Sequence, residues 1–195
     1  MIDYIKGSIV ELNPSEAVLD NNGLGFSFLI SVQTYEAIKE KKECMLFVHH
    51  YIREDDEEFF GFASKEERKM FRLLISVSGI GVASARMMLS SMSTEEIENA
   101  ILSEDIVRIK SIKGIGAKSA QRLVLELKDK IIKGDGSVTE NLVLSDSNGN
   151  IEQATTALVL LGFSKQNVSK ALRDILKKNP SASVEEIIKD ALKSL

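Results

Sequence analysis

The chain has 195 residues, of which 44% are hydrophobic and 28% charged, a balance typical of a globular protein with a packed core. No apolar run approaches the roughly 18 residues that a membrane span requires, and the first residues are not typical of a signal peptide. The single cysteine, Cys44, excludes an internal disulfide and a cysteine cluster for zinc. We therefore expect a cytoplasmic protein without a metal or other cofactor.

The net charge of −4 hides an uneven distribution of charge along the chain. Residues 1–63 carry 5 Lys and Arg against 12 Asp and Glu, residues 64–133 carry 13 against 9, and residues 134–195 carry 7 against 8. Because binding of a polyanion depends on the local field, the middle segment is the candidate for binding nucleic acid. A solvated helical surface explains the same positive excess, so charge alone does not decide.

The first 63 residues predict a small β-barrel domain. Residues 5–12, 26–32, 45–52 and 59–62 have the alternation or the apolar content of short strands, and Asn21-Asn22-Gly23 predicts a turn. Four or five short strands within about sixty residues favour a closed barrel of the OB type.

An acidic run, Glu54-Asp55-Asp56-Glu57-Glu58, separates the last two of these strands. The simplest interpretation is a solvated turn. A nuclease site built from paired carboxylates is the alternative, but no further cluster of acids or histidines completes it in the sequence. His49 and His50 lie on opposite faces of one strand and cannot share a metal ion.

At Ser64 the hydrophobic period changes from 2 to 3.6, and residues 64–133 predict an all-α domain with short turns. Ser64 with Glu67, and Ser93 with Glu96, have the spacing of a capping box, in which serine and glutamate satisfy each other's backbone amide. Helical structure is therefore expected to begin at each of these serines.

The last third of the chain predicts a linker and a small helical module. Residues 134–150 are rich in turn-forming and polar residues and are expected to form a flexible linker. Residues 151–195 predict three short helices, the first ending at Gly162 in a left-handed cap. A module of fewer than fifty residues is marginal alone, so we expect it to dock a partner.

The basic segment contains an internal repeat offset by 35 residues. Ser78-Gly79-Ile80-Gly81 in the first copy matches Lys113-Gly114-Ile115-Gly116 in the second, and each turn lies between two predicted helices. Glycines permit a positive φ and a close approach of the backbone, while the isoleucine is expected to pack inward. The following helix then presents free N–H groups and its positive dipole end to a phosphate. A turn with a packing role only is the alternative, and a second matching copy argues against it.

The paired hairpins resemble the tandem helix-hairpin-helix motif, and their position after a small β domain resembles the RuvA family, which binds Holliday junctions. Arg53-Glu54-Asp55 followed by Phe60-Gly61-Phe62 resembles the acidic strand-pin-strand segment of that family. Residues 112–123 resemble its second hairpin, and residues 153–163 resemble its C-terminal module. The resemblance covers essentially the whole chain.

The resemblance implies an α+β multidomain protein with four parts. These are an OB-fold barrel (1–63), a tandem helix-hairpin-helix domain (64–133), a flexible linker (134–150) and a three-helix UBA-like module (151–195). It implies a homotetramer, or an octamer on DNA, that holds a four-way junction open and itself lacks catalytic activity. ATP hydrolysis is expected in a partner, the hexameric ATPase RuvB, and the resolvase RuvC is a further candidate partner.

Site residues follow from the hairpins and from the resemblance. The residues expected to bind DNA phosphates are Gly79, Gly81, Arg86, Lys113, Gly114, Gly116, Ala117, Lys118 and Arg122. Glu54 and Asp55 are expected to form an acidic pin that repels phosphates at the junction centre. Leu158, Leu161 and Phe163 are expected to form the partner-binding face, although at least one of them is expected to belong to the core of the module instead.

The first hairpin departs from the family pattern. Members of the family often carry a lysine in the turn after the second glycine, whereas this chain has Val82-Ala83-Ser84, and Arg86 is the nearest cation. The second hairpin has Lys113, Lys118 and Arg122 nearby. We therefore expect the first hairpin to bind phosphate mostly through its backbone and the second to contribute the larger salt-dependent share.

Two other classes of protein use similar elements. Structure-specific nucleases and glycosylases also contain helix-hairpin-helix pairs, but they need catalytic acids, a lysine nucleophile or a metal in a cleft, and the sequence indicates none. An adaptor with vestigial hairpins is the other alternative. Gly116-Ala117-Lys118-Ser119 is similar to the end of a P-loop, but Ala117 occupies the position of a required glycine.

Overall fold

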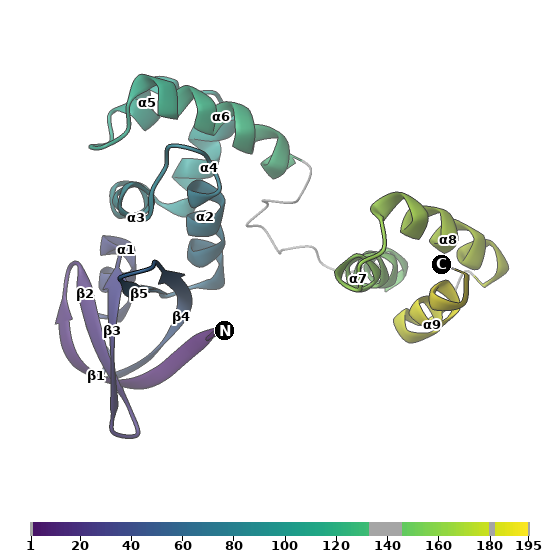
Figure 1. Ribbon diagram of the computed structural model, residues 1–195, viewed down its shortest axis with the longest axis horizontal. Coiled ribbons are helices and arrows are strands. Elements are labelled where there is room, and N and C mark those ends of the chain that lie inside the picture. Colours follow the sequence, from purple (N-terminus) through teal and green to yellow (C-terminus); the bar gives the residue numbers. More distant parts are fainter. Residues whose placement is uncertain (1, 133–145, 180–181, 195) are drawn as a thin grey trace. The chain divides into compact units, whose positions relative to one another are not determined.

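The computed structural model describes residues 2–132, 146–179 and 182–194. The chain divides into two compact units, Met1–Glu140 and Asn141–Leu195, and each unit is described by itself. Figure 1 shows the strands of the first unit gathered below a group of helices. In the described part of the chain, no helix is both long enough and apolar enough to cross a membrane.

Five strands close into a barrel in the order β1-β2-β3-β5-β4. The strands are β1 (Tyr4–Asn13), β2 (Glu16–Asn21), β3 (Leu24–Ile30), β4 (Glu43–Ile52) and β5 (Glu57–Phe62). The β3–β5 pair is parallel and the other pairs are antiparallel. Asn22 and Gly23 both have positive φ values, 52° and 87°, as the predicted two-residue turn requires. The prediction of a small OB-like barrel is confirmed.

A short helix, α1 (Val32–Ile38), interrupts the barrel between β3 and β4. The sequence prediction extended a strand to residue 32 and had no helix there, which is wrong. The strand ends because Ser31 is the N-cap of α1, and its side chain accepts a hydrogen bond from the Thr34 amide. The helix packs against α3 (Val82–Ser91), so it joins the barrel to the helical region.

The helical part of the first unit follows the barrel directly. Its other helices are α2 (Lys65–Ile75), α4 (Thr94–Leu102), α5 (Ile106–Lys110) and α6 (Ala117–Ile132). Ser93 and Glu96 form the complete capping box that their spacing predicts. Ser64 caps α2, but the carboxylate of Glu67 turns away from it and joins the barrel side, so the predicted reciprocal box is formed only in part.

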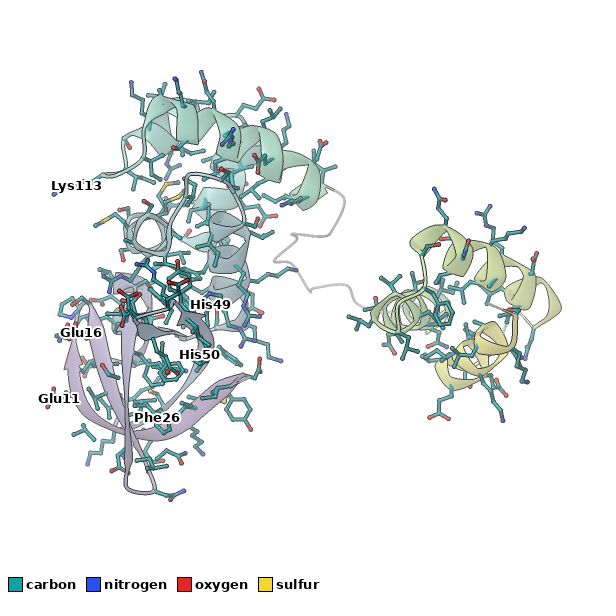
Figure 2. All side chains as sticks on the ribbon, viewed as in Figure 1. Glu11, Glu16, Phe26, His49, His50 and Lys113 are labelled. Carbon is teal, nitrogen blue, oxygen red and sulfur yellow. The ribbon has the colours of Figure 1, made fainter. Side chains whose placement is uncertain are left out.

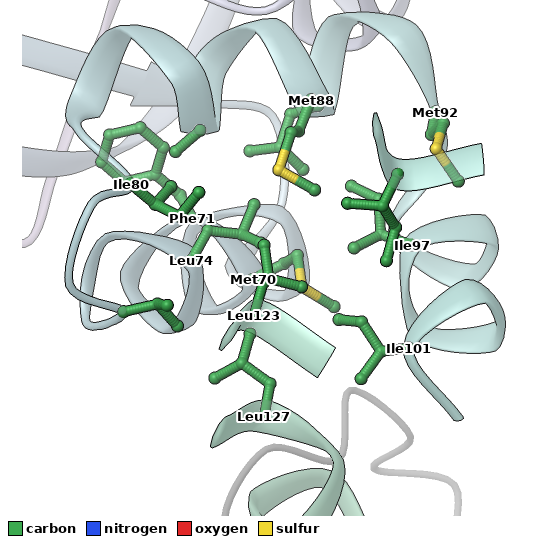
Figure 3. Close-up of a cluster of buried hydrophobic side chains, with 14 of the residues drawn as sticks. Met70, Phe71, Leu74, Ile80, Met88, Met92, Ile97, Ile101, Leu123 and Leu127 are labelled. Carbon is green, nitrogen blue, oxygen red and sulfur yellow. The ribbon is translucent and has the colours of Figure 1, made fainter. Parts of the chain in front are cut away.

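The helices α2–α6 share one apolar core, which positions both hairpins. Figure 3 shows the side chains of Met70, Met88, Ile97 and Leu123 meeting in it, and all of these side chains are fully buried. Phe60 and Phe62 of β5 extend the same core toward the barrel. The barrel has a second core of its own, which includes Phe28.

The second unit is a three-helix module with a separate core. It contains α7 (Asp146–Leu160), α8 (Lys165–Lys178) and α9 (Val184–Ser194). Gly162 has a φ of 100° and ends α7, as predicted. The predicted linker of residues 134–150 is wrong at its end, because α7 already begins at Asp146 and Asp, Ser and Asn are accepted in the first turn of a helix. The rest of that linker lies outside the described residues.

Candidate nucleic-acid interface

The first hairpin is a tight turn between α2 and α3. Gly79 has a φ of 91°, in the left-handed region that favours glycine. The amide of Ile80 donates to the carbonyl of Val77 over 3.0 Å, and the Ile80 side chain is buried. Gly81 is the N-cap of α3, and its carbonyl accepts from the Ala85 amide at 3.0 Å. The isoleucine thus anchors the turn from inside, as predicted.

The second hairpin, between α5 and α6, repeats this geometry position by position. Gly114 also has a φ of 91°. The Ile115 amide donates to the carbonyl of Ile112 at 3.1 Å, and the Ile115 side chain is buried. The Gly116 carbonyl accepts from the Ala120 amide at 2.9 Å. The internal repeat seen in the sequence is therefore a repeat in structure.

The two glycines of each hairpin have different roles, because only the first of them has a positive φ. Gly81 has a φ of −87°, which any residue adopts, and Gly116 is likewise not among the glycines with positive φ. A Cβ at Gly81 or Gly116 would meet no other atom of the chain within 4 Å. These second glycines are exposed, and a methyl group there would occupy the space in front of the helix N-terminus.

That space is where an anion is expected. The first turn of an α-helix has backbone N–H groups without partners inside the helix, and the helix dipole makes this end positive. Gly81 provides no side chain to cap α3. Ala117, the first residue of α6, is exposed beside Gly116. Both hairpins therefore leave a helix N-terminus open to a phosphate oxygen.

The hairpins also contact each other reciprocally. The Oγ atom of Ser119 lies 3.6 Å from the position that a Cβ of Gly79 would take. The Oγ atom of Ser84 lies 3.7 Å from the equivalent position at Gly114. Ser84 and Ser119 are equivalent positions of the repeat, so the hairpins are related by an approximate twofold arrangement. Sequence analysis missed both serines, although their 35-residue offset was a usable signal.

Exposed cations concentrate near the second hairpin. Lys113 and Lys118 are exposed, and Lys113 projects from the tip of the α5–α6 turn (Figure 2). Arg122 is exposed on α6, and its Nη1 atom lies 3.4 Å from the carbonyl oxygen of Ser78 in the first hairpin. Arg86 is half-buried and donates from Nη1 to the carbonyl of Ser15 in the β1–β2 turn at 3.0 Å. The cation predicted for the first hairpin thus binds the barrel, and Arg122 reaches across to that hairpin.

Several cations of the basic segment are paired with acids, including Arg122, whose Nε atom lies 3.6 Å from Glu126 Oε1. Arg108 Nη2 lies 2.6 Å from Glu96 Oε1, and Lys128 Nζ lies 2.5 Å from Glu104 Oε1. The Ser93 amide together with Arg108 lowers the pKa of Glu96, and Lys128 lowers the pKa of Glu104. The pairs of Arg108 and Lys128 offset part of the positive excess away from the hairpins.

Glu54, Asp55 and Asp56 of the acidic run form the turn between β4 and β5, and Glu57 and Glu58 begin β5. The Arg53 amide donates to the carbonyl of Asp56 at 2.8 Å, which closes the turn. Glu54 and Asp55 lie at its tip and are exposed to solvent. The guanidinium of Arg53 lies 4.9 Å from the ring centroid of Tyr51. The turn therefore presents a compact negative charge.

The other candidate residues of the barrel contribute no site. His49 packs among aromatic rings, 5.3 Å from Phe71 and 6.4 Å from Phe60 between centroids, and burial lowers its pKa. Among the described residues, no group of three or more His, Cys, Asp or Glu side chains is arranged to hold a metal ion. Cys44 is buried, and burial raises the pKa of its thiol.

The structure separates the three predicted partner-binding residues of the C-terminal module. Leu158 is fully buried in the core of the module, so its assignment to a surface is wrong: α8 and α9 cover it. Phe163 is partly buried against that core. Leu161 is 61% exposed and Leu160, which the sequence prediction missed, is 82% exposed. Among the described residues of this module, the exposed leucines are Leu160, Leu161 and Leu192, and the first two are adjacent at the end of α7.

A five-stranded barrel followed by two reciprocal hairpins with open helix N-termini defines a tandem helix-hairpin-helix protein. Residues 71–129 match the family described as a SAM-like helix-hairpin-helix tandem. Residues 1–61 match the RuvA N terminal domain, and residues 149–195 match the RuvA C-terminal domain. The chain belongs to the RuvA family.

Named relatives agree with this assignment over their full length. A protein of Christiangramia forsetii is 46% identical over 195 residues, which is all of both chains, and one of Bacteroides fragilis is 48% identical over all of both chains. A protein of Chlorobium limicola is 39% identical over all of this chain and 98% of its own. Each is named Holliday junction branch migration complex subunit RuvA.

Proposed function

We propose that the protein binds the sugar-phosphate backbone of a four-way DNA junction through its two hairpins. The observation that carries this proposal is the reciprocal pair of hairpins, in each of which a glycine with an empty Cβ position precedes the second helix. Contacts of this kind fix the position of DNA without reading bases. The names of the relatives support a branched DNA substrate in particular.

Because the hairpins read no bases, the preference for a four-way junction over other DNA then has to come from the assembly of several copies of the protein. Four copies around one junction would bring four acidic turns to its centre, where Glu54 and Asp55 repel phosphates and keep the strands apart. Each strand would be directed into the basic surface of a neighbouring hairpin pair. In this homotetramer the hairpins hold the arms and the acidic turns hold the crossover open and square.

The proposed role is that of a non-catalytic subunit in recombination and DNA repair. The C-terminal module would recruit the RuvB ATPase, which hydrolyses ATP to drive branch migration, through the exposed Leu160 and Leu161 with Phe163 at their edge. RuvC is a further candidate partner on the same junction. Acting on chromosomal DNA, the protein would work in the bacterial cytoplasm.

The experiment that tests the open-junction role is energy transfer between dyes on the ends of junction arms. In magnesium, a free junction stacks its arms in pairs, and the protein is expected to bring adjacent and opposite arm distances to those of an open square. Native mass spectrometry of the same sample is expected to give four copies per junction. A complex in which the arms stay stacked would contradict the proposal.

The proposed repulsion of phosphates by the acidic turn can be tested separately. The double substitution Glu54→Gln with Asp55→Asn removes the charge and preserves the size of both side chains, so it is expected to keep or tighten junction binding while altering migration by the motor. A loss of binding comparable to that of a hairpin substitution would show that the turn is not a repulsive pin.

A further inference from the structure

Glu67 is a buried carboxylate at the boundary between the barrel and the helices. Its residue is 4% exposed. Its two oxygens accept hydrogen bonds from hydroxyl groups of α1: Ser31 Oγ donates to Oε1, and Thr34 Oγ1 donates to Oε2 at 2.7 Å. Burial raises the pKa of Glu67. A buried charge is costly unless it is hydrogen-bonded, so this arrangement requires both hydroxyls.

The hydroxyls are themselves oriented by backbone amides. The Thr34 amide donates to Ser31 Oγ at 3.0 Å, and the Ala63 amide donates to Thr34 Oγ1 at 3.0 Å. Because each oxygen accepts from an N–H group, the hydroxyl hydrogen is left to point at Glu67. The carboxylate is the common acceptor of two donor chains, one from α1 and one from the residue that follows β5.

The neighbouring cation does not neutralise this carboxylate. Arg68 donates from Nη1 to the backbone carbonyl of Asp3 at 2.6 Å, to its carboxylate at 2.7 Å and to the carbonyl of Val48 at 3.1 Å. Glu67 and Arg68, which are consecutive residues at the start of α2, therefore bind the barrel domain at two separate places. Arg68 binds β4 and the start of the chain, and Glu67 binds α1.

The same helix α1 is also fastened to α3. The Val32 amide donates to Ser90 Oγ at 3.2 Å, and the side-chain amide of Gln33 donates to the carbonyls of Leu89 and Met92. Helix α1 thus holds both helices that flank the first hairpin, α2 through Glu67 and α3 through Gln33. Figure 1 shows it at the top of the barrel, beneath α3.

We propose that Glu67 is a positioning residue for junction recognition, which fixes the acidic β4–β5 turn in register with the first hairpin. The Ala63 amide lies at the end of β5, and the other end of β5 carries the acidic turn. A linear duplex needs only the hairpins, whereas a junction needs hairpins and acidic turn at a set spacing. Loss of the Glu67 network therefore weakens binding of the junction and leaves binding of a duplex unchanged.

This inference rests on the proposed function, and two substitutions test it. Glu67→Gln places an amide donor where a hydroxyl donor already points, and Thr34→Val removes that hydroxyl with nearly unchanged shape. Glu96→Gln is the control, because Glu96 lies in α4, away from α1, and accepts from the backbone amide of Ser93 and from Arg108 Nη2. Fluorescence anisotropy gives the Kd of the full chain for an immobile four-way junction and for a linear duplex of one arm's sequence.

The expected result is a fall of about tenfold in the preference for junction over duplex in both Glu67→Gln and Thr34→Val, the size of one lost hydrogen bond to a charged group. In both variants, the Kd for the linear duplex is expected to stay within about twofold of the value for the unchanged chain. Glu96→Gln is expected to bind both DNA forms like the unchanged chain. An unchanged preference in both variants would overturn the inference, and so would equal weakening toward both DNA forms, which loss of folding produces. Absence of any preference in the unchanged chain would instead overturn the proposed function.

Discussion

The difference in charge between the two hairpins predicts how salt affects variants of Lys118 and Arg86. Lys118 is exposed in the first turn of α6, beside an open helix N-terminus. Arg86 is half-buried, and its guanidinium donates to the carbonyl of Ser15. We therefore expect Lys118→Ala to remove a phosphate contact and Arg86→Ala to remove mainly a contact with the barrel.

The magnitude follows from counterion release. Each phosphate contact contributes about 0.9 to the slope of log affinity against log salt concentration. If four copies bind one junction, Lys118→Ala removes four such contacts and is expected to reduce this slope by about 3.6. Between roughly 50 and 200 mM salt that difference amounts to about 150-fold in affinity. The change in slope for Arg86→Ala is expected to be smaller.

The assay is a titration of labelled junction at several salt concentrations. Lys193→Ala is a suitable control, because Lys193 lies in the other unit and pairs with Asp190 at 2.8 Å, so its slope should equal that of the unchanged chain. A larger loss of slope for Arg86→Ala than for Lys118→Ala would refute the assignment of the salt-dependent share to the second hairpin.

Three further predictions concern folding and binding. Gly79→Ala is expected to lower the free energy of unfolding by about 1 kcal/mol, because Gly79 has a positive φ. Gly81→Ala is expected to leave thermal unfolding unchanged and to weaken DNA binding. An equal decrease in melting temperature in the two variants would contradict these separate roles. Leu158→Ala is expected to destabilise the C-terminal module by about 2 to 5 kcal/mol, whereas Leu161→Ser retains its circular dichroism and loses capture of the RuvB motor. Burial raises the folded-state pKa of Glu67 above its ordinary value of 4.5. The contribution of Glu67 to the free energy of unfolding is therefore fully present below pH 4.5 and is lost as pH rises through the raised pKa. Denaturation of the unchanged chain and of Glu67→Gln should therefore show the unchanged chain gaining relative stability as pH falls toward 4.5, and a difference that does not vary with pH would contradict a raised pKa of Glu67.

The hairpins were predictable because their conformation is set locally. A glycine at the left-handed position, an inward isoleucine and a following helix lie within a few residues of each other, and the same pattern occurs twice. Helix starts at Ser93 and Ser164 are equally local, because each serine accepts from an amide three residues on. Such features depend little on the rest of the fold.

The features that the sequence did not reveal depend on contacts between distant residues. The carbonyl that Arg86 contacts is 71 positions away, and the Ser78 carbonyl that Arg122 contacts is 44 positions away. Leu158 and Leu161 look alike in an apolar stretch, but side chains of α8 and α9 bury only Leu158. Helix α1 was missed because its β-branched and aromatic residues are also typical of strands, and only the cap at Ser31 distinguishes it.

The central claim is that paired hairpins hold the DNA backbone while the assembly selects the branch. Its most direct test is the ratio of the Kd values for a linear duplex and for an immobile four-way junction with the same arm sequences, repeated with the arm sequences exchanged. We predict a strong preference for the junction that does not change when the sequences are exchanged. Equal affinity for the two forms, or a preference that follows the sequence of the arms, would contradict the account.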